Sequence, residues 1–211
     1  MSNGGRFPRE HAPDAGSSRY NLRVPLYHFS EEPDISVFEP RGAPGAVMPE
    51  PVVWAIDDWH QPMYFTPREC PRACFWPGER TTPEDRTRFF GNVSARMVMA
   101  IESRWLNRLR QATLFRYEVP DATFEPRGDG SGHWVSRSPV VPLAVETMTD
   151  LLNSLVSSNV ELRVTPSLIA LWKDVIQSSL EFSGTRLSNA EGWTEIDWAA
   201  VPLGVYGTPK A

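Results

Sequence analysis

Twenty of the 211 residues are proline, and their distribution limits the length of every regular element in this chain. Proline holds φ near about −65° and has no N–H to donate, so it interrupts the interior of helices and sheets. The same properties favour it in turns. We therefore expect many short elements joined by fixed turns, and no long helix.

The composition is that of an ordinary globular protein. Hydrophobic residues make up 41% of the chain and charged residues 22%, close to the usual values. A chain of 211 residues fits one domain with tails or two very small domains. Eight tryptophans and ten phenylalanines supply large, flat groups for a core or for stacking.

The chain divides into three parts by composition. Residues 1–20 are rich in Gly, Ser, Pro, Arg and acids, which predicts a disordered leader. Residues 21–190 alternate strand and helix patterns and predict a single α+β domain. Residues 191–211 lack such a pattern but contain Trp193 and Trp198, which we expect to pack this tail onto the domain. No internal repeat or heptad pattern is present.

Short apolar or alternating runs predict the strands. The predicted strands are 22–29, 52–56, 73–76, 114–119, 133–136, 139–146 and 160–164. Residues 96–101 fit either a buried strand or a helix, and we favour a strand.

Capping residues and apolar periodicity predict the helices. Thr82, followed by Pro83 and two acids, is typical of a helix start. Further helices are predicted over 103–111, from 148 to about 159, and after Ser167. Residues 57–62 could cap a short helical turn along which residues 63–65 would lie.

Charge and hydropathy argue against two classes of partner. The net charge is −5 and the basic residues are scattered among acids, whereas nucleic-acid binding requires a basic face. The local run Arg104–Arg110 is more typical of a solvated helix surface. No run approaches the length of a membrane span, and the N-terminus has no hydrophobic segment of a signal peptide. We expect a cytoplasmic protein that binds neither nucleic acid nor membrane.

The two cysteines do not indicate a disulfide framework or a metal site. Cys70 and Cys74 could supply half of a zinc site, but no second pair of ligands follows at a suitable spacing. Four histidines without regular spacing point to no metal either. We expect both cysteines to be buried thiols.

Standard catalytic motifs are absent from the sequence. No G-x-S-x-G turn, Walker loop or G-x-G-x-x-G is present. Ser131 lies near His133 in a glycine-rich segment, for which a flexible loop is the favoured interpretation. Carboxylates such as Asp57 and Glu118 have no partner that the sequence alone can identify.

One group of polar residues remains as a candidate pocket. A neutral imidazole at His28 could donate to a sugar hydroxyl, the ring of Tyr64 could stack on a heterocycle, and arginines could bind a diphosphate. Each residue also has a purely structural interpretation, as a core or surface side chain. The candidates are Tyr27, His28, Ser30, Arg41, Tyr64, Arg68 and Glu146.

Several segments resemble a family of uncharacterised bacterial proteins that is labelled only as a domain of unknown function. The similar segments are 26–41, 53–57, 63–72, 134–137 and 139–143, so the resemblance covers most of residues 24–190. It implies no established activity.

The opening strand, with Leu26-Tyr27-His28 and the hydroxyl of Ser30, is distantly similar to ADP-ribosyltransferase folds of the His-Tyr-Glu type. This resemblance implies a compact split β-sheet or barrel core with short helices packed around it, and a nucleotide ligand such as NAD. It assigns the ribose of NAD to His28 and stacking on nicotinamide to Tyr64, with Arg41 or Arg68 near the phosphates.

The sequence departs from that family at the catalytic glutamate. The corresponding window, Ser136–Val140, contains no acid, and Glu146 is the nearest downstream carboxylate. Three functions therefore stay open. The chain could be an ADP-ribosyltransferase or NAD glycohydrolase with His28 and Glu146 as catalytic residues, a binding module for a nucleotide-like small molecule, or a protein-interaction domain.

Overall fold

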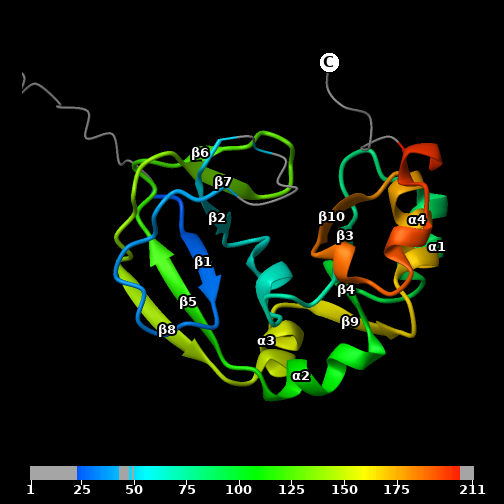
Figure 1. Ribbon diagram of the computed structural model, residues 1–211. Coiled ribbons are helices and arrows are strands. Elements are labelled where there is room, and N and C mark those ends of the chain that lie inside the picture. Colours follow the sequence, from blue (N-terminus) through cyan, green and yellow to red (C-terminus); the bar gives the residue numbers. More distant parts are fainter. Residues whose placement is uncertain (1–22, 43–47, 49, 205–211) are drawn as a thin grey trace, which may run out of the picture.

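The computed structural model describes residues 23–42, 48 and 50–204, which form a mixed α/β structure with two β-sheets and four α-helices (Figure 1). The predicted leader at 1–20 lies outside the described residues. Within the described part, the predicted mixture of strands and helices is confirmed, and the two sheets do not close into a barrel.

The larger sheet has six strands, all antiparallel to their neighbours, in the order β6-β7-β2-β1-β5-β8. Its strands are β1 (Leu26–Ser30), β2 (Val53–Asp57), β5 (Leu114–Val119), β6 (Glu125–Pro126), β7 (His133–Ser136) and β8 (Ala144–Met148). Side chains alternate between its two faces, so it can bury apolar residues on both.

The smaller sheet has four strands in the order β10-β3-β4-β9. They are β3 (Arg72–Trp76), β4 (Met97–Glu102), β9 (Val160–Thr165) and β10 (Glu181–Thr185). β4 and β9 are parallel, and every residue of β3 and β4 is buried. Burial on both faces explains why residues 96–101 show no alternation of polar and apolar residues. The prediction of a strand there is confirmed.

The helices are short, as the prolines predict. They are α1 (Pro83–Phe90), α2 (Leu106–Gln111), α3 (Leu151–Ser157) and α4 (Ile169–Gln177). Short 3₁₀ helices add η1 (Gln61–Tyr64), η2 (Ser103–Trp105), η3 (Leu187–Asn189), η4 (Trp193–Glu195) and η5 (Trp198–Ala200). The helix start at Thr82 is confirmed, since its hydroxyl accepts a hydrogen bond from the backbone N–H of Asp85.

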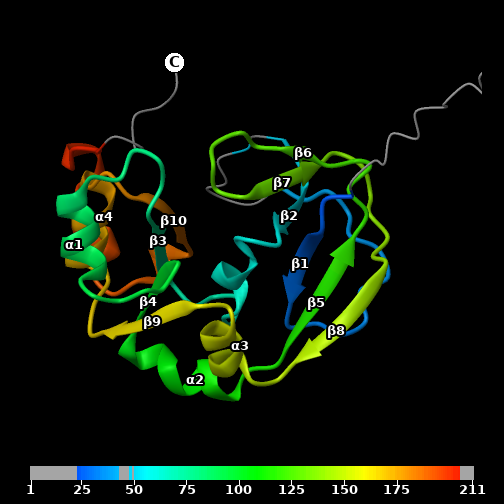
Figure 2. The same cartoon turned by 180° about the vertical axis from the view of Figure 1, so that it is seen from behind.

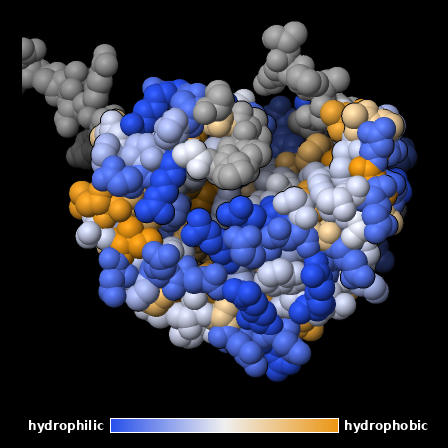
Figure 3. Space-filling view, viewed as in Figure 1, coloured by the Kyte–Doolittle hydropathy of each residue, from blue (hydrophilic) through white to orange (hydrophobic). Residues whose placement is uncertain are grey.

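The two sheets lie on opposite sides of the molecule, with η1 between them and α2 and α3 at one end (Figures 1 and 2). On the face shown in Figure 3, hydrophilic residues predominate and an apolar patch lies at the left edge, on the side where Figure 1 places β8. Exposed apolar side chains on this edge strand and just before it include Val141, Leu143 and Val145. No helix within the described ranges is long and apolar enough to cross a membrane.

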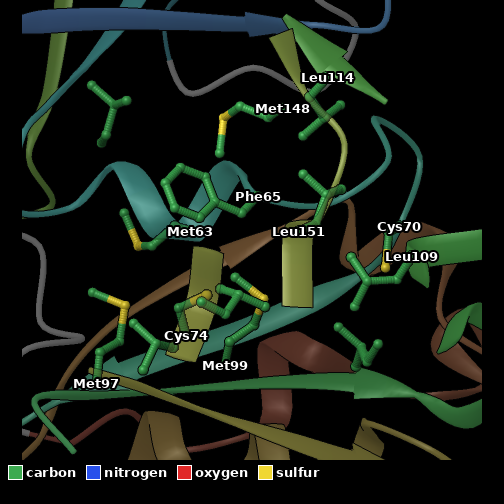
Figure 4. Packing of buried hydrophobic residues seen from close by; sticks show 14 of the residues in the cluster. Met63, Phe65, Cys70, Cys74, Met97, Met99, Leu109, Leu114, Met148 and Leu151 are labelled. Carbon is green, nitrogen blue, oxygen red and sulfur yellow. The ribbon is translucent and has the colours of Figure 1, made fainter. Parts of the chain in front are cut away.

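A core rich in sulfur fills the space between the sheets (Figure 4). It brings Met97 and Met99 of β4 against Met63 and Phe65 from η1 and the residue after it. Cys70 and Cys74 lie in the same core as free, buried thiols, which confirms the sequence prediction. Burial raises the pKa of each thiol to about 12, so neither is a reactive thiolate at neutral pH.

Two further clusters cover the outer faces of the sheets. α1 and α4 pack on the far side of the smaller sheet, where Phe89 and Trp172 contact the cluster that contains Phe75. Trp193 and Trp198 stack with ring centroids 4.1 Å apart and pack against the same cluster. On the larger sheet, loops cover the outer face.

Some predicted boundaries differ from the structure, and β6 and β10 were not predicted. The strand expected over 139–146 begins only at Ala144, because Pro139 and Pro142 have no N–H for a ladder, and Val140 makes an isolated bridge to Phe38. The helix expected over 103–111 is confirmed: its first turn is the 3₁₀ helix η2, and α2 follows from Leu106 to Gln111. β10 was missed, because its residues include polar groups and Gly184.

Candidate functional site

The larger sheet is interrupted between two of its central strands. β1 pairs with β5 at five positions but with β2 at only two, Leu26↔Asp57 and Tyr27↔Ile56. Beyond Tyr27 the strands separate, and a small cavity of about 50 Å³, here called the seam hollow, lies at the separation. It is lined by Tyr27, His28, Phe29, Trp54, Ala55, Ile56 and Tyr64.

His28 bridges the separated strands through its side chain. Its Nδ1 lies 2.7 Å from the carbonyl oxygen of Trp54 on β2, and its ring packs on Phe38 with centroids 4.4 Å apart. The imidazole thus replaces a backbone hydrogen bond that a continuous ladder would make. Tertiary packing rather than local sequence fixes this side chain.

The bond to Trp54 determines what the imidazole can offer a ligand. Burial lowers the pKa of His28; the Trp54 carbonyl opposes this effect, while the positive charges of Arg68 and Arg41 add to it. The ring is therefore neutral at pH 7, and because a carbonyl only accepts, its single proton is on Nδ1. Its Nε2 is a hydrogen-bond acceptor with no partner among the described residues, which corrects the expectation that His28 donates to a sugar hydroxyl.

Tyr64 approaches the same hollow from η1. Its hydroxyl lies 2.7 Å from Nε2 of His133, and its ring lies parallel to Phe29 at a centroid distance of 6.1 Å. The buried guanidinium of Arg72 lies 5.0 Å from the ring centroid. The Tyr64 ring is therefore already held by three neighbours.

The hydroxyl of Tyr64 begins a hydrogen-bond network that ends at a carboxylate. Nδ1 of His133 lies 2.7 Å from Oγ of Ser131, and that hydroxyl in turn bonds to Oδ1 of Asp129. We call Tyr64, His133, Ser131 and Asp129 the Tyr64 network. Burial lowers the pKa of His133 to about 4, so its imidazole is neutral at pH 7.

The loop that carries Ser131 is held against the turn after β2. The backbone N–H of Asp57 donates to the carbonyl of Gly132, and a Cβ added at Gly132 would lie 2.2 Å from Nδ1 of His60. Gly132 also has φ of +73°, which favours glycine. The loop that the sequence predicts to be flexible is thus anchored, and the Ser131–His133 pair was the sequence signal for the network.

The other predicted pocket residues take different places. Ser30 is buried and accepts a hydrogen bond from the N–H of Glu32, so it stabilises the turn after β1. Tyr27 lines the hollow, with the guanidinium of Arg116 4.9 Å from its ring centroid. Arg41 and Arg68 are exposed, and both are close enough for their charges to lower the pKa of His28.

Glu146 is not brought to His28. It pairs with Arg116 across β5 and β8, on the face that Phe29 shares, and its carboxylate bonds to that arginine. His28 shares the opposite face with Tyr117. The segment Ser136–Val140, where the resemblance expects the catalytic glutamate, contains no acid. Its first residue, Ser136, is buried and donates a hydrogen bond to the hydroxyl of Thr123.

No group of three or more His, Cys, Asp or Glu side chains that could hold a metal ion occurs in the described part of the chain. The groups in and around the seam hollow are aromatic rings, the neutral imidazoles of His28 and His133, and nearby arginines. These groups suit an uncharged ring or hydroxyl-bearing ligand with an anionic extension.

Residues 27–190 match the Family of unknown function (DUF6886). The chain belongs to this family. No curated protein and no solved structure shows a significant match to it. The resemblance to the uncharacterised family is thereby confirmed over most of the expected range.

Proposed function

We propose that this DUF6886 protein is a binding module of the ADP-ribosyltransferase-like type, which takes up NAD or a related nucleotide at the seam hollow. The observation that carries the proposal is that His28 and Tyr64, from segments far apart in sequence, line one hollow where β1 and β2 separate. Nε2 of His28 is an unused acceptor because Trp54 holds the other ring nitrogen.

The size of the hollow limits which part of a nucleotide it can hold. One buried water needs roughly 10–15 Å³, and the hollow measures about 50 Å³. It therefore admits the edge of a ring or sugar and not a whole dinucleotide. The remainder would lie at the surface, where Arg41 and Arg68 supply positive charge suited to a diphosphate.

The proposal is for binding without cleavage of the N-glycosidic bond. Cleavage would benefit from a carboxylate that stabilises the positive charge developing on the ribose. Glu146 bonds to Arg116 and lies on the face opposite His28. Support for this part of the proposal comes from that arrangement and from the absence of an acid in Ser136–Val140.

A thermal-shift titration with NAD and with ADP-ribose tests the proposal. A ligand at one hundred times its Kd stabilises the folded state by about 2.7 kcal/mol, so the melting temperature should rise with ligand concentration. No nicotinamide should be released in parallel incubations. The absence of any shift at millimolar concentrations of either ligand would overturn the proposal.

Variants locate the site. His28→Asn retains an N–H donor for the Trp54 carbonyl but loses the Nε2 acceptor, so it should fold and bind more weakly. Arg41→Ala and Arg68→Ala should weaken binding of ADP-ribose, increasingly so at low salt. Arg110→Ala, on the exposed side of α2, is the matched control and should bind as the wild type does.

A further inference from the structure

The described part of the chain has four sheet edges, and three of them carry features that discourage pairing with another strand. β6 has only two residues, of which Pro126 has no N–H and Glu125 bonds to Arg137. β9 carries the ion pair of Glu161 and Arg163. β10 contains a glutamate, a serine and a glycine, and glycine weakens a strand. Short length, proline and charge are the usual protection of a natural sheet edge.

β8 is the fourth edge, and it lacks this protection. Within the described ranges no strand pairs with its outer side. Residues 143–148 read Leu-Ala-Val-Glu-Thr-Met, without proline or glycine. Their one charged residue, Glu146, is already bonded to Arg116 of the same sheet. Every residue of β8 except the last is exposed, so this edge is open to another strand.

Apolar side chains are spaced along this edge. Val141, Leu143 and Val145 follow one another at intervals of two residues, and each is more than half exposed. Side chains two residues apart lie on the same face of an extended chain. Exposed Val37 belongs to the same region, because it directly precedes the residue that forms a bridge to Val140. An apolar patch lies on this side of the molecule in Figure 3, and such a patch marks a contact surface.

We propose that β8 pairs with β8 of a second copy of this chain, antiparallel and around a two-fold axis, so that the two six-stranded sheets become one continuous sheet. A second copy fits because the other three edges are protected, which leaves β8 to meet β8. Pairing of one edge with its own copy is self-complementary and closes at two chains. The proposal does not depend on nucleotide binding at the seam hollow.

The residues of β8 exclude most registers of this pairing. Opposite residues of an antiparallel pair point to the same face, so the two-fold axis must place one residue opposite its own copy. An axis at Glu146 would place two carboxylates opposite each other, which is destabilising. An axis at Leu143 or Ala144 would bring Pro142, which has no N–H to donate, into the paired segment. An axis at Thr147 would extend the pairing beyond the end of β8.

An axis at Val145 meets none of these obstacles. It places Val145 opposite its own copy, and Leu143 opposite the partner's Thr147. The exposed apolar side chains of both copies then lie together on one face. Glu146 lies opposite the partner's Ala144, so each carboxylate keeps Arg116 of its own chain and faces no like charge.

The mass of the full chain in solution is the first test. Analytical ultracentrifugation over a range of protein concentrations should show a species with twice the mass of one chain, in equilibrium with the monomer. A monomer at every concentration would overturn the proposal. A series of ever larger aggregates without a distinct dimer would also overturn it, because pairing of β8 with β8 stops at two chains.

Engineered cysteines test the register. With oxidised glutathione as the oxidant, Val145→Cys should form a disulfide-linked dimer, because opposite Cβ atoms in a strand pair lie about 4.5–5.5 Å apart, near the range that a disulfide spans. Leu143→Cys should not link to itself, since the two copies would lie about 13 Å apart along the strands. It should link to Thr147→Cys when the two variants are mixed. The natural thiols of Cys70 and Cys74 are buried and do not compete. Self-linkage of Leu143→Cys as rapid as that of Val145→Cys would overturn the register.

Charge at the axis tests the interface itself. Val145→Lys should be monomeric, because two ammonium groups would lie opposite each other, and Val145→Glu should be monomeric for the same reason. An equal mixture of the two variants should form a mixed dimer, which a loss of folding in either variant could not produce. Val156→Lys, at an even more exposed valine on α3, is the matched control and should dimerise as the wild type does. A dimer retained in Val145→Lys, or lost equally in Val156→Lys, would overturn the proposal.

Discussion

The two sheets of this molecule differ in how continuously their central strands are paired. In the smaller sheet β3 and β4 are buried at every position and their ladder is continuous over four residue pairs. In the larger sheet β1 and β2 share only two pairs before they separate. Backbone hydrogen bonds join β3 to β4 in the smaller sheet, whereas in the larger sheet the His28 side chain links β1 to β2 where their backbone pairing ends.

The difference indicates where each sheet can accept change. The smaller sheet buries its β3 and β4 side chains between the shared core and the cover of α1 and α4, so its residues serve stability. The seam uses polar groups where apolar packing would be more stabilising. Polar groups retained at such a position are typical of a binding site.

The largest expected effect on stability comes from a cavity in the core of the smaller sheet. Phe75 is fully buried and contacts the rings of Phe89 and Phe90 at centroid distances of 5.7 and 5.9 Å. Phe75→Ala should lower the free energy of unfolding by about 3–5 kcal/mol, measured by urea denaturation, because it leaves a cavity. Phe29→Ala at the half-buried seam should cost less; an equal loss would remove the distinction between the sheets.

Acid should lower the free energy of unfolding through His133. The pKa of His133 is lowered from an ordinary 6.5 to about 4 in the folded protein. The unfolded state therefore binds more protons between these values, and stability falls as the pH decreases from about 6.5 to about 4, by about 3 kcal/mol from this group.

Denaturation of the wild type and of His133→Gln across this pH range isolates that contribution. The variant should lose less stability than the wild type on acidification. Parallel pH profiles would show that the imidazole is not responsible.

Loss of the hydrogen bond from His28 to the Trp54 carbonyl should have an intermediate effect on stability. His28→Leu leaves the Trp54 carbonyl without its donor and should lower the free energy of unfolding by about 1–3 kcal/mol. His28→Asn should recover part of the loss, because its amide can donate to the same oxygen. Identical losses in both variants would indicate that packing on Phe38, and not the hydrogen bond, holds the strands.

The smallest expected effect concerns the cover of the smaller sheet. Thr82→Ala removes the N-cap of α1 and should reduce stability by about 1 kcal/mol. Thr87→Ala, at an exposed position within the same helix, is the control and should be neutral or slightly stabilising. Thermal denaturation monitored by circular dichroism distinguishes the two, and a loss in the control equal to that of Thr82→Ala would argue against the cap.

Local chemistry made most elements predictable. The Thr82 cap, the apolar run of β2 and the alternation of β5 each identify their element without tertiary information. β10 could not be found this way, because its pairing with β3 depends on the other sheet strands already being in place. The start of β8 was misplaced because the apolar pattern continues through Pro139 and Pro142, where no ladder forms.

The site was only partly predictable for a physical reason. A sequence shows that His28 and Tyr64 are capable of binding, and both do line the hollow. It does not show which atoms are already in use, and those contacts come from residues 26 and 69 positions away. For this reason the sequence assigned His28 the wrong hydrogen-bonding role and left Ser131 and His133 out of the site.

The order of strands along the chain has a consequence for folding. β1 and β2 belong to the larger sheet, β3 and β4 to the smaller, β5 to β8 to the larger again, and β9 and β10 to the smaller. No single cut of the polypeptide can release either sheet intact, and the parallel β4–β9 pair can form only after all six strands of the larger sheet have been synthesised. Such long-range pairing slows folding, so the two halves are expected to form and to melt as one cooperative unit.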